Sequence, residues 1–322
     1  MKTRQLGNQG LTVSSIGLGC MGMSEFYGGF DEQNSFATLS KALDIGVKFW
    51  DTADIYGPYT NEELLGKYFS QHPSAREQIV LASKFGIVRS DKGEFVGLNG
   101  RPEYIKTSCD ASLKRLGVDQ LDVYYQHRID PNVPIEESVG ALADLVSDGK
   151  IKYIGLSEAT SDQLERANKV HPISVLQTEY SLWSREIEQQ ILPTCNKLGI
   201  GFVAYSPLGR GFLTGAFKSR DDFEKGDWRL ENPRFSEENF QQNLVVVERI
   251  NALAIAKNCT PAQLALAWIS HQNENYVPIP GTRNIHRLIE NAGSIEISLS
   301  PEEIQNITNE FPSELVHGGR YD

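Results

Sequence analysis

The chain has 322 residues, enough for one large barrel or two ordinary domains, and its 40% hydrophobic and 23% charged residues are typical of a globular protein. A formal net charge of −11 argues against non-specific nucleic-acid binding, so an anionic ligand must meet a local basic cluster. Residues 1–7 lack the apolar core of a signal peptide, and no stretch approaches the length of a membrane span. We therefore expect a cytoplasmic protein with no membrane partner.

Eight short apolar runs, each suited to a buried strand, recur at fairly even intervals. They span residues 16–19, 48–50, 79–82, 121–125, 153–156, 174–177, 202–205 and 276–279. Helical patterns lie between them, such as one that opens at residues 101–103 and closes at 116–117, and another that opens at 161–163. This alternation requires parallel strands joined by crossover helices. It predicts an α/β fold, a (β/α)8 TIM barrel, as one domain over residues 1–322.

One segment, from Leu208 to about Asn243, is too long for an ordinary connection and is rich in charge and glycine. It carries Trp228 and Phe235 within a polar run. Because it follows the seventh barrel strand (residues 202–205), it is expected to lie at the active-site face, where we interpret it as a lid over cofactor or substrate.

Two other sequence patterns are weak indicators of function. The GLGCMG sequence at residues 17–22 matches the dinucleotide-binding expression G-x-G-x-x-G, but it runs into loop residues, and the helical pattern begins only near Asp31. A Rossmann fold is therefore not expected. The cysteines are scattered without metal-ligand or disulfide spacing, and the histidines other than His127 fall in predicted helices or turns, so no metal site is expected.

Polar side chains suited to proton transfer follow three successive predicted strands. Asp51 and Tyr56 come after the second strand. Lys84 comes after the third and His127 after the fourth. Each residue alone would be an ordinary polar group at a strand end. Because the carboxyl ends of barrel strands converge on one rim, the four are expected to meet and form a catalytic site.

A site of this composition suits the reduction of a carbonyl group by hydride transfer. The reaction produces an alkoxide, which needs a nearby proton donor and electrostatic support. A phenol with a pKa of about 10 is a poor acid at neutral pH, but a neighbouring Lys lowers that pKa and an Asp keeps the Lys charged and oriented. Tyr56 is therefore predicted to donate the proton, supported by Lys84 and Asp51. His127 is expected to donate a hydrogen bond that positions the substrate oxygen.

The chain resembles the aldo-keto reductase superfamily over nearly its whole length. The matching segments are GLGCMG (17–22), DTADIYG (51–57), SKFG (83–86), His127, GLSE (155–158), QTEY (177–180), AYSPLGRG (204–211) and IPGTR (279–283). The resemblance implies a (β/α)8 barrel that binds NADPH without a Rossmann fold. It also implies a catalytic tetrad, which falls on Asp51, Tyr56, Lys84 and His127. Asp54 is a rival carboxylate, but the motif places the catalytic one five residues before Tyr56, so Asp54 is expected to be structural.

The same resemblance implies where the cofactor binds. Tyr205 corresponds to the ring that stacks on the nicotinamide, and residues 206–211 correspond to a loop that covers the pyrophosphate. Arg283 and Arg287 correspond to the site of the adenosine 2′-phosphate, and Arg suits phosphate through its paired N–H donors, which favours NADP over NAD. The implied cofactor residues are Met21, Gly22, Asp51, Ser157, Glu158, Gln177, Tyr205, Ser206, Pro207, Leu208, Gly209, Arg210, Gly211, Gly281, Thr282, Arg283, Arg287, Glu290 and Asn291.

Two positions depart from the family pattern. Glu158 stands where many relatives have an Asn that binds the nicotinamide carboxamide, and since a carboxylate only accepts, it is expected to receive the carboxamide NH2 group. Gly281 stands where some members have Lys. The 2′-phosphate is therefore expected to be held through Thr282 and the two arginines.

The segments GCMGMS (19–24), LSEA (156–159) and YSLW (180–183) most resemble a branch with perakine-reductase-like and auxin-induced-protein-like enzymes, which tend to accept many aldehydes. Phe26, Tyr27 and Trp183 are the expected pocket walls. The chain is thus predicted to be an NADPH-dependent reductase of small-molecule aldehydes or ketones, acting as a monomer or small homo-oligomer. The alternative is an NADPH-binding regulatory subunit of a channel or complex with little turnover, although no partner-docking segment is evident.

Overall fold

The structure, a computed structural model, describes residues 1–24, 31–90 and 93–321. Its central sheet is a set of parallel strands in the order β12-β11-β10-β9-β8-β5-β4-β3. The sheet closes on itself, because the Gly17 N–H donates to the Pro278 carbonyl at 2.9 Å and Gly19 pairs in parallel with Gly281. The predicted (β/α)8 barrel and its eight strands are confirmed. The strands are β3 (Leu18–Gly19), β4 (Phe49–Asp51), β5 (Val80–Phe85), β8 (Leu121–Gln126), β9 (Ile151–Ser157), β10 (Val175–Glu179), β11 (Gly201–Tyr205) and β12 (Tyr276–Pro278).

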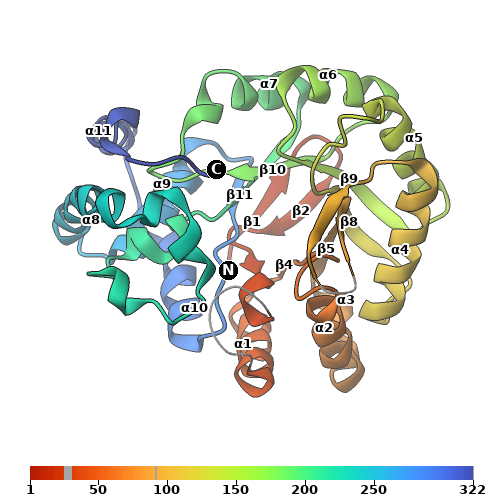
Figure 1. Cartoon of the computed structure of the whole chain (residues 1–322), viewed down its shortest axis with the longest axis horizontal. Coiled ribbons are helices and arrows are strands. Elements are labelled where there is room, and N and C mark those ends of the chain that lie inside the picture. Colours follow the sequence, from red (N-terminus) through yellow and green to blue (C-terminus); the bar gives the residue numbers. More distant parts are fainter. Residues whose placement is uncertain (25–30, 91–92, 322) are drawn as a thin grey trace.

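Helices surround the barrel (Figure 1). Their ends follow the expected signals: Asp31 caps the first helix by accepting from the Asn34 N–H, and Gly117 ends the helix after Leu116 in the left-handed conformation that glycine favours. The helices are α1 (Glu32–Ile45), α2 (Thr60–Gln71), α3 (Pro73–Gln78), α4 (Pro102–Leu116), α5 (Ile135–Ser147), α6 (Ser161–Val170), α7 (Ile191–Leu198), α8 (Glu237–Ala256), α9 (Pro261–Gln272), α10 (Ile285–Ala292) and α11 (Pro301–Glu310).

The barrel interior is a packed apolar core that an N-terminal hairpin closes from one end. Strands β1 (Thr3–Leu6) and β2 (Leu11–Ser14) pair antiparallel and insert their apolar side chains. Burial of these chains stabilises the barrel by about 25 cal/mol per Å² of apolar surface removed from water. The other end of the barrel carries the carboxyl ends of the parallel strands, and the hairpin leaves this end open for the site. The interior side chains include Leu6, Leu11, Val13, Phe49, Val123, Val175, Val203 and Val277.

Two additions to the barrel lie on its active-site side. Strands β6 (Ile87–Arg89) and β7 (Phe95–Leu98) form an antiparallel hairpin after β5. The long segment after β11 folds into short 3-10 turns, η3 (Gly209–Thr214), η4 (Arg220–Asp222), η5 (Trp228–Glu231) and η6 (Pro233–Phe235). This segment was expected to reach about residue 243. It ends earlier, because the Ser236 side chain accepts from the Asn239 N–H and begins α8 at Glu237.

The remaining general features are consistent with the composition. The four cysteines are free thiols, and burial raises the pKa of both Cys109 and Cys195 to about 12. Within residues 1–24, 31–90 and 93–321, no group of three or more His, Cys, Asp or Glu side chains is arranged to hold a metal ion. In the same residues, every helix is too short or too polar to cross a bilayer.

Candidate active site

A buried Lys84 joins the two groups that the sequence placed beside it. Its Nζ forms an ion pair with the Asp51 carboxylate, donates to the Thr52 carbonyl at 2.9 Å and lies 3.4 Å from the Tyr56 hydroxyl. Neither Lys84 nor Asp51 is exposed by more than 2%, so the ion pair is almost dry. The second Asp51 oxygen accepts from the Gln177 amide at 2.8 Å. The Asp–Lys–Tyr chain therefore has a fixed order, with the phenol at its end.

The His127 ring stands next to that phenol. It meets the Tyr56 ring edge-on, with the ring centres 5.9 Å apart at an interplanar angle of 88°. Burial, together with the charges of Lys84 and Arg128, holds the pKa of His127 well below its ordinary value. The imidazole is therefore neutral at neutral pH and carries one N–H. Its Nδ1 has no hydrogen-bond partner among the described residues, and the side chain lines the same cavity as Tyr56.

The electrostatics of Tyr56 and Lys84 favour a protonated phenol and a charged ammonium. Burial raises the pKa of Tyr56, and the nearby Lys84 only partly offsets this effect. The predicted lowering of the phenol pKa by Lys84 is thus present but smaller than the opposing effect of desolvation. Burial alone would lower the pKa of Lys84, but the Asp51 carboxylate and the Tyr56 contact raise it above its ordinary value. At neutral pH, Tyr56 holds a proton and Lys84 stands ready to stabilise the phenolate.

Asp54 lies away from this chain of contacts. Its side chain is buried, and burial followed by the nearby Glu62 raises its pKa well above the ordinary value. Glu62 is itself paired with Arg115, whose Nε donates at 2.7 Å. Asp54 is absent from the walls of the cavity. Its backbone joins the turn that carries Tyr56 to β5, because the Asp54 N–H donates to the Lys84 carbonyl at 3.1 Å and the Asp54 carbonyl accepts from the Tyr59 N–H at 2.8 Å. A structural role for Asp54 stays a prediction.

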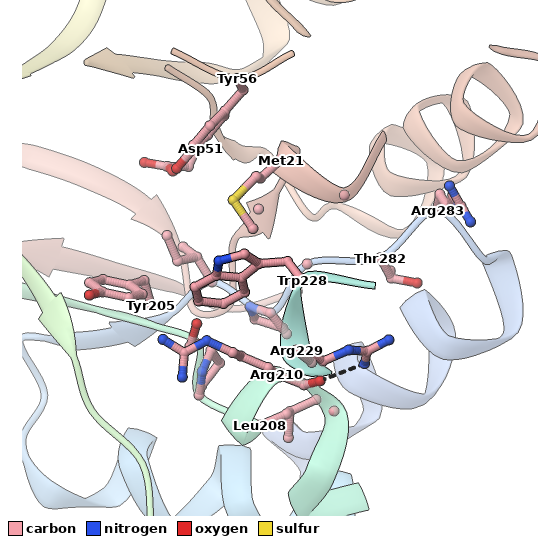
Figure 2. A pocket seen from close by; sticks show the side chains of 18 of the residues that line it. Met21, Asp51, Tyr56, Tyr205, Leu208, Arg210, Trp228, Arg229, Thr282 and Arg283 are labelled. Atoms are coloured by element: carbon pink, nitrogen blue, oxygen red, sulfur yellow. Dashed lines mark hydrogen bonds between the residues drawn. The ribbon is translucent and has the colours of Figure 1, made fainter. Parts of the chain in front are cut away.

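A cavity of about 830 Å³ extends from Tyr56 and His127 across the barrel end to α10. Figure 2 shows Tyr56 and Asp51 at one side, Met21 and Trp228 facing each other near the middle, and Arg283 at the far side. Ligand sites are of this size. The cavity walls include most of the predicted cofactor residues, namely Met21, Gly22, Asp51, Ser157, Gln177, Tyr205, Ser206, Pro207, Leu208, Arg210, Gly211, Gly281, Thr282, Arg283, Arg287, Glu290 and Asn291.

The backbone after β11 takes a tight path, and of its two glycines Gly211 lines the cavity whereas Gly209 lies behind the walls. Gly209 and Gly211 have φ values of 56° and 91°, and Ser206 and Arg210 also have positive φ. A side chain at Gly209 would collide with the Trp183 ring, whose nearest atom would lie 2.6 Å from the added carbon. The tight loop therefore requires glycine at this position.

Trp183 belongs to the support of this loop and is absent from the cavity walls. It is only 3% exposed and stacks on Phe212, with the ring centres 5.0 Å apart. Trp183 therefore lies behind the walls of this cavity, in contact with Phe212 and Phe235, and its role as a pocket wall stays a prediction. Phe26 and Tyr27, the other two expected pocket residues, lie outside the described residues.

Glu158 is also behind the walls, and its carboxylate already has protein partners. Its Oε1 accepts from Arg320 Nη2 at 2.8 Å and from the Glu179 N–H at 3.1 Å. Burial would raise the pKa of Glu158, but the charge and hydrogen bond of Arg320, the charge of Arg128 and the Glu179 N–H together lower it. The expected contact with a carboxamide would therefore compete with an ion pair that sequence reasoning did not foresee.

The cavity also has walls that the sequence did not identify as site residues. Trp228 stood out as an aromatic residue in a polar run, which was the available signal for it. Arg128 follows His127 directly, and its Nη1 donates to the Ser157 hydroxyl at 3.3 Å. Tyr321 reaches the cavity from the C-terminal segment, which no motif indicated. The walls added by the structure include Ile87, Arg89, Arg128, Phe217, Trp228, Arg229 and Tyr321.

Comparison with known proteins supports the assignment of the fold and the family. A family model described as "Aldo/keto reductase family" matches residues 15–309. Among solved structures, the chain is similar to the glycerol dehydrogenase AKR11B4 from Gluconobacter oxydans, with 29% sequence identity and a TM-score of 0.86. The match covers 97% of this chain and 96% of that one. With a family model that matches most of its length and a barrel of the same fold, the chain belongs to the aldo/keto reductase family, a family of oxidoreductases.

Proposed function

We propose that this protein reduces aldehydes and ketones to alcohols with NADPH, with Tyr56 as the proton donor. The observation that carries the proposal is the contact of the Tyr56 hydroxyl with the buried Lys84–Asp51 pair at the wall of the large cavity. A protonated phenol backed by a dry ammonium can release a proton as negative charge develops on a neighbouring oxygen.

The roles of the four residues follow from their surroundings. A bound dihydronicotinamide would supply a hydride to the carbonyl carbon. Tyr56 gives its hydroxyl proton to the carbonyl oxygen, which forms the alcohol. Lys84 stabilises the resulting phenolate, and Asp51 holds the ammonium in place. The neutral His127 ring donates its N–H to the substrate oxygen and so orients the carbonyl.

The residues at the other end of the cavity fit a phosphorylated dinucleotide. Gly211 brings bare glycine backbone to the wall, and Arg283 and Arg287 bring positive charge to a protein that is acidic as a whole. An Arg fork suits a phosphate monoester. This donor set supports NADPH over NADH, with Tyr205 as the surface for the nicotinamide ring.

We infer the substrate class from the walls of the cavity near Tyr56 and His127. Met21, Ile87 and Trp228 contribute apolar surface to the walls, whereas Arg128 contributes charge. Such mixed walls suit a range of small aldehydes, in keeping with the resemblance to the perakine-reductase-like and auxin-induced-protein-like branch. The related structure is named a glycerol dehydrogenase, so small hydroxyaldehydes and hydroxyketones also belong among the candidates.

The test is the oxidation of NADPH and NADH by the purified protein with aromatic, aliphatic, dicarbonyl and hydroxylated carbonyl compounds, beside the Tyr56→Phe variant. That variant loses only the proton donor, so turnover should fall by about 10²- to 10⁴-fold while NADPH still binds. Tyr59→Phe is the matched control, since Tyr59 is 44% exposed and lies outside the cavity walls.

Near-normal activity of Tyr56→Phe would contradict the mechanism. Tight NADPH binding by the wild-type protein without turnover of any compound would support the alternative role, that of an NADPH-binding regulatory subunit.

A further inference from the structure

The C-terminal segment returns to the active-site end of the barrel and is fastened there. The His317 backbone exchanges hydrogen bonds with the Asn243 side chain, N–H to Oδ1 at 2.8 Å and Nδ2 to O at 2.9 Å. The Asn232 amide donates to the Arg320 carbonyl at 2.8 Å. The segment therefore lies in a defined place against the long segment after β11, and it brings Arg320 and Tyr321 to the rim.

The Arg320 guanidinium links the ends of three neighbouring barrel strands. Its Nη2 donates to Glu158 Oε1 after β9 at 2.8 Å and to the Tyr205 hydroxyl at the end of β11 at 3.1 Å. Its Nε lies 3.3 Å from Glu179 Oε2 at the end of β10. The Arg320 side chain is only 19% exposed, so these contacts are largely shielded from water.

Glu158 depends on Arg320 more than Glu179 does. Glu179 is fully buried and also pairs with Arg210 at 3.3 Å and Arg234 at 3.5 Å. For Glu158, Arg320 is the one ion-pair partner within 4 Å in the described part of the chain. Loss of the guanidinium would thus leave Glu158 as an uncompensated carboxylate beside Tyr205, while Glu179 keeps two cations.

The position of Tyr205 is set from its hydroxyl end. In the described residues, that hydroxyl contacts Arg320 and the Tyr321 hydroxyl, the latter at 3.0 Å. The ring lines the cavity. A platform for a flat ring needs a fixed orientation, and among the described residues the C-terminal segment supplies the polar contacts of the Tyr205 hydroxyl.

We infer that Arg320 is a positioning residue for the nicotinamide half of the cofactor: it neutralises Glu158 and holds the Tyr205 ring in place. The inference rests on the proposed function, because it takes Tyr205 as the nicotinamide platform. The adenosine half binds near Arg283 and Arg287, at the other end of the cavity, and does not depend on Arg320. Ligands with and without the nicotinamide half should therefore differ in how strongly their affinity depends on Arg320.

The experiment compares two ligands by calorimetry, NADP⁺ and adenosine 2′,5′-bisphosphate, which lacks the nicotinamide. Arg320→Met keeps an unbranched apolar stem but removes the charge and the donors. We expect its Kd for NADP⁺ to rise about tenfold or more, as for a lost charged hydrogen bond, and its Kd for the bisphosphate to stay unchanged. Arg320→Lys, which keeps the charge, should recover part of the affinity for NADP⁺. The control is Arg249→Met, which removes an exposed ion pair between Arg249 on α8 and Glu310 at the end of α11.

Glu158→Gln tests the same link from the other side and guards against poor folding of Arg320→Met. It should weaken the binding of NADP⁺ but not that of the bisphosphate. The double variant should lose less binding free energy for NADP⁺ than the sum of the two single losses, since the residues act together. Unchanged NADP⁺ binding in both single variants, or equal weakening of both ligands, overturns the inference. Failure of the wild-type protein to bind NADP⁺ or NADPH at all would instead overturn the proposed function.

Discussion

The two sides of the active-site rim are built by different means. From β4 to β8, the proposed catalytic groups belong to strand ends or to the turn directly after a strand, and the charges of Lys84 and Asp51 balance within this group. From β9 to β12, the strand ends supply carboxylates and Tyr205, but their partners come from elsewhere. Arg210 and Arg234 come from the long segment, and Arg320 comes from the C-terminal segment.

Under the proposed function, the difference separates proton chemistry from cofactor placement. The proton-transfer groups of the first side lie at close range, so strand ends suffice to hold them. The second side would hold a long ligand, and its arginines fasten added segments to the barrel around the buried Glu179. Substitutions on the first side should therefore change turnover, and substitutions on the second side should change affinity.

The largest effect, on both turnover and stability, is expected from Lys84→Met on the first side of the rim. The variant loses the ammonium that supports the Tyr56 phenolate, so kcat should fall by at least about 10²-fold. It also leaves Asp51 charged and unpaired in a dry site, which should lower the free energy of unfolding by about 3–5 kcal/mol. Stopped-flow turnover and urea unfolding measure the two effects.

The matched control is the double variant Asp51→Asn, Lys84→Met, which removes both charges. It should recover much of the stability but none of the activity. Recovery of activity together with stability would mean that Lys84 acts only as structural support.

A smaller effect is expected from Arg283→Ala or Arg287→Ala on the second side. Each variant removes a cation from the end of the cavity opposite Tyr56, so KM for NADPH should rise about tenfold or more while kcat holds. KM for NADH should change little, because NADH lacks the 2′-phosphate. Steady-state kinetics with both cofactors measure this, and equal increases in both KM values would remove the 2′-phosphate assignment.

The smallest effect is expected from Asp54→Asn, on stability alone. Because the pKa of Asp54 is raised by burial and then by Glu62, rising pH ionises it first in the unfolded chain. Above its ordinary pKa of 3.8, each pH unit then costs the folded state up to about 1.4 kcal/mol, until the folded carboxyl ionises too.

Asp54→Asn should therefore raise the urea midpoint at pH 8, with a gain that shrinks as the pH falls toward 4. Turnover should be retained, in contrast to substitution of Asp51. A constant gain at all pH values would show that Asp54 is ionised in the folded protein over that range.

The same division explains what could be predicted from the sequence. The barrel followed from eight apolar runs and their helix signals, and the neighbourhood of Asp51, Tyr56, Lys84 and His127 followed from barrel topology. Neither step needs contacts between distant segments. Arg320 is 162 residues from Glu158, and no periodicity or spacing connects them. The burial of Trp183 could not be predicted for a related reason, since a buried aromatic and a pocket aromatic look alike in sequence, and only the fold shows that Trp183 packs against Phe212.

The N-terminal hairpin has a practical consequence for anyone handling the protein. The first residues emerge beside Gly46, at the barrel end that the hairpin closes, whereas Tyr321 lies in the wall of the cavity at the other end. A purification tag or fluorescent fusion attached ahead of Met1 leaves the cavity accessible. The same tag joined after the C-terminal segment would crowd the cavity mouth and compete for the space around Tyr205.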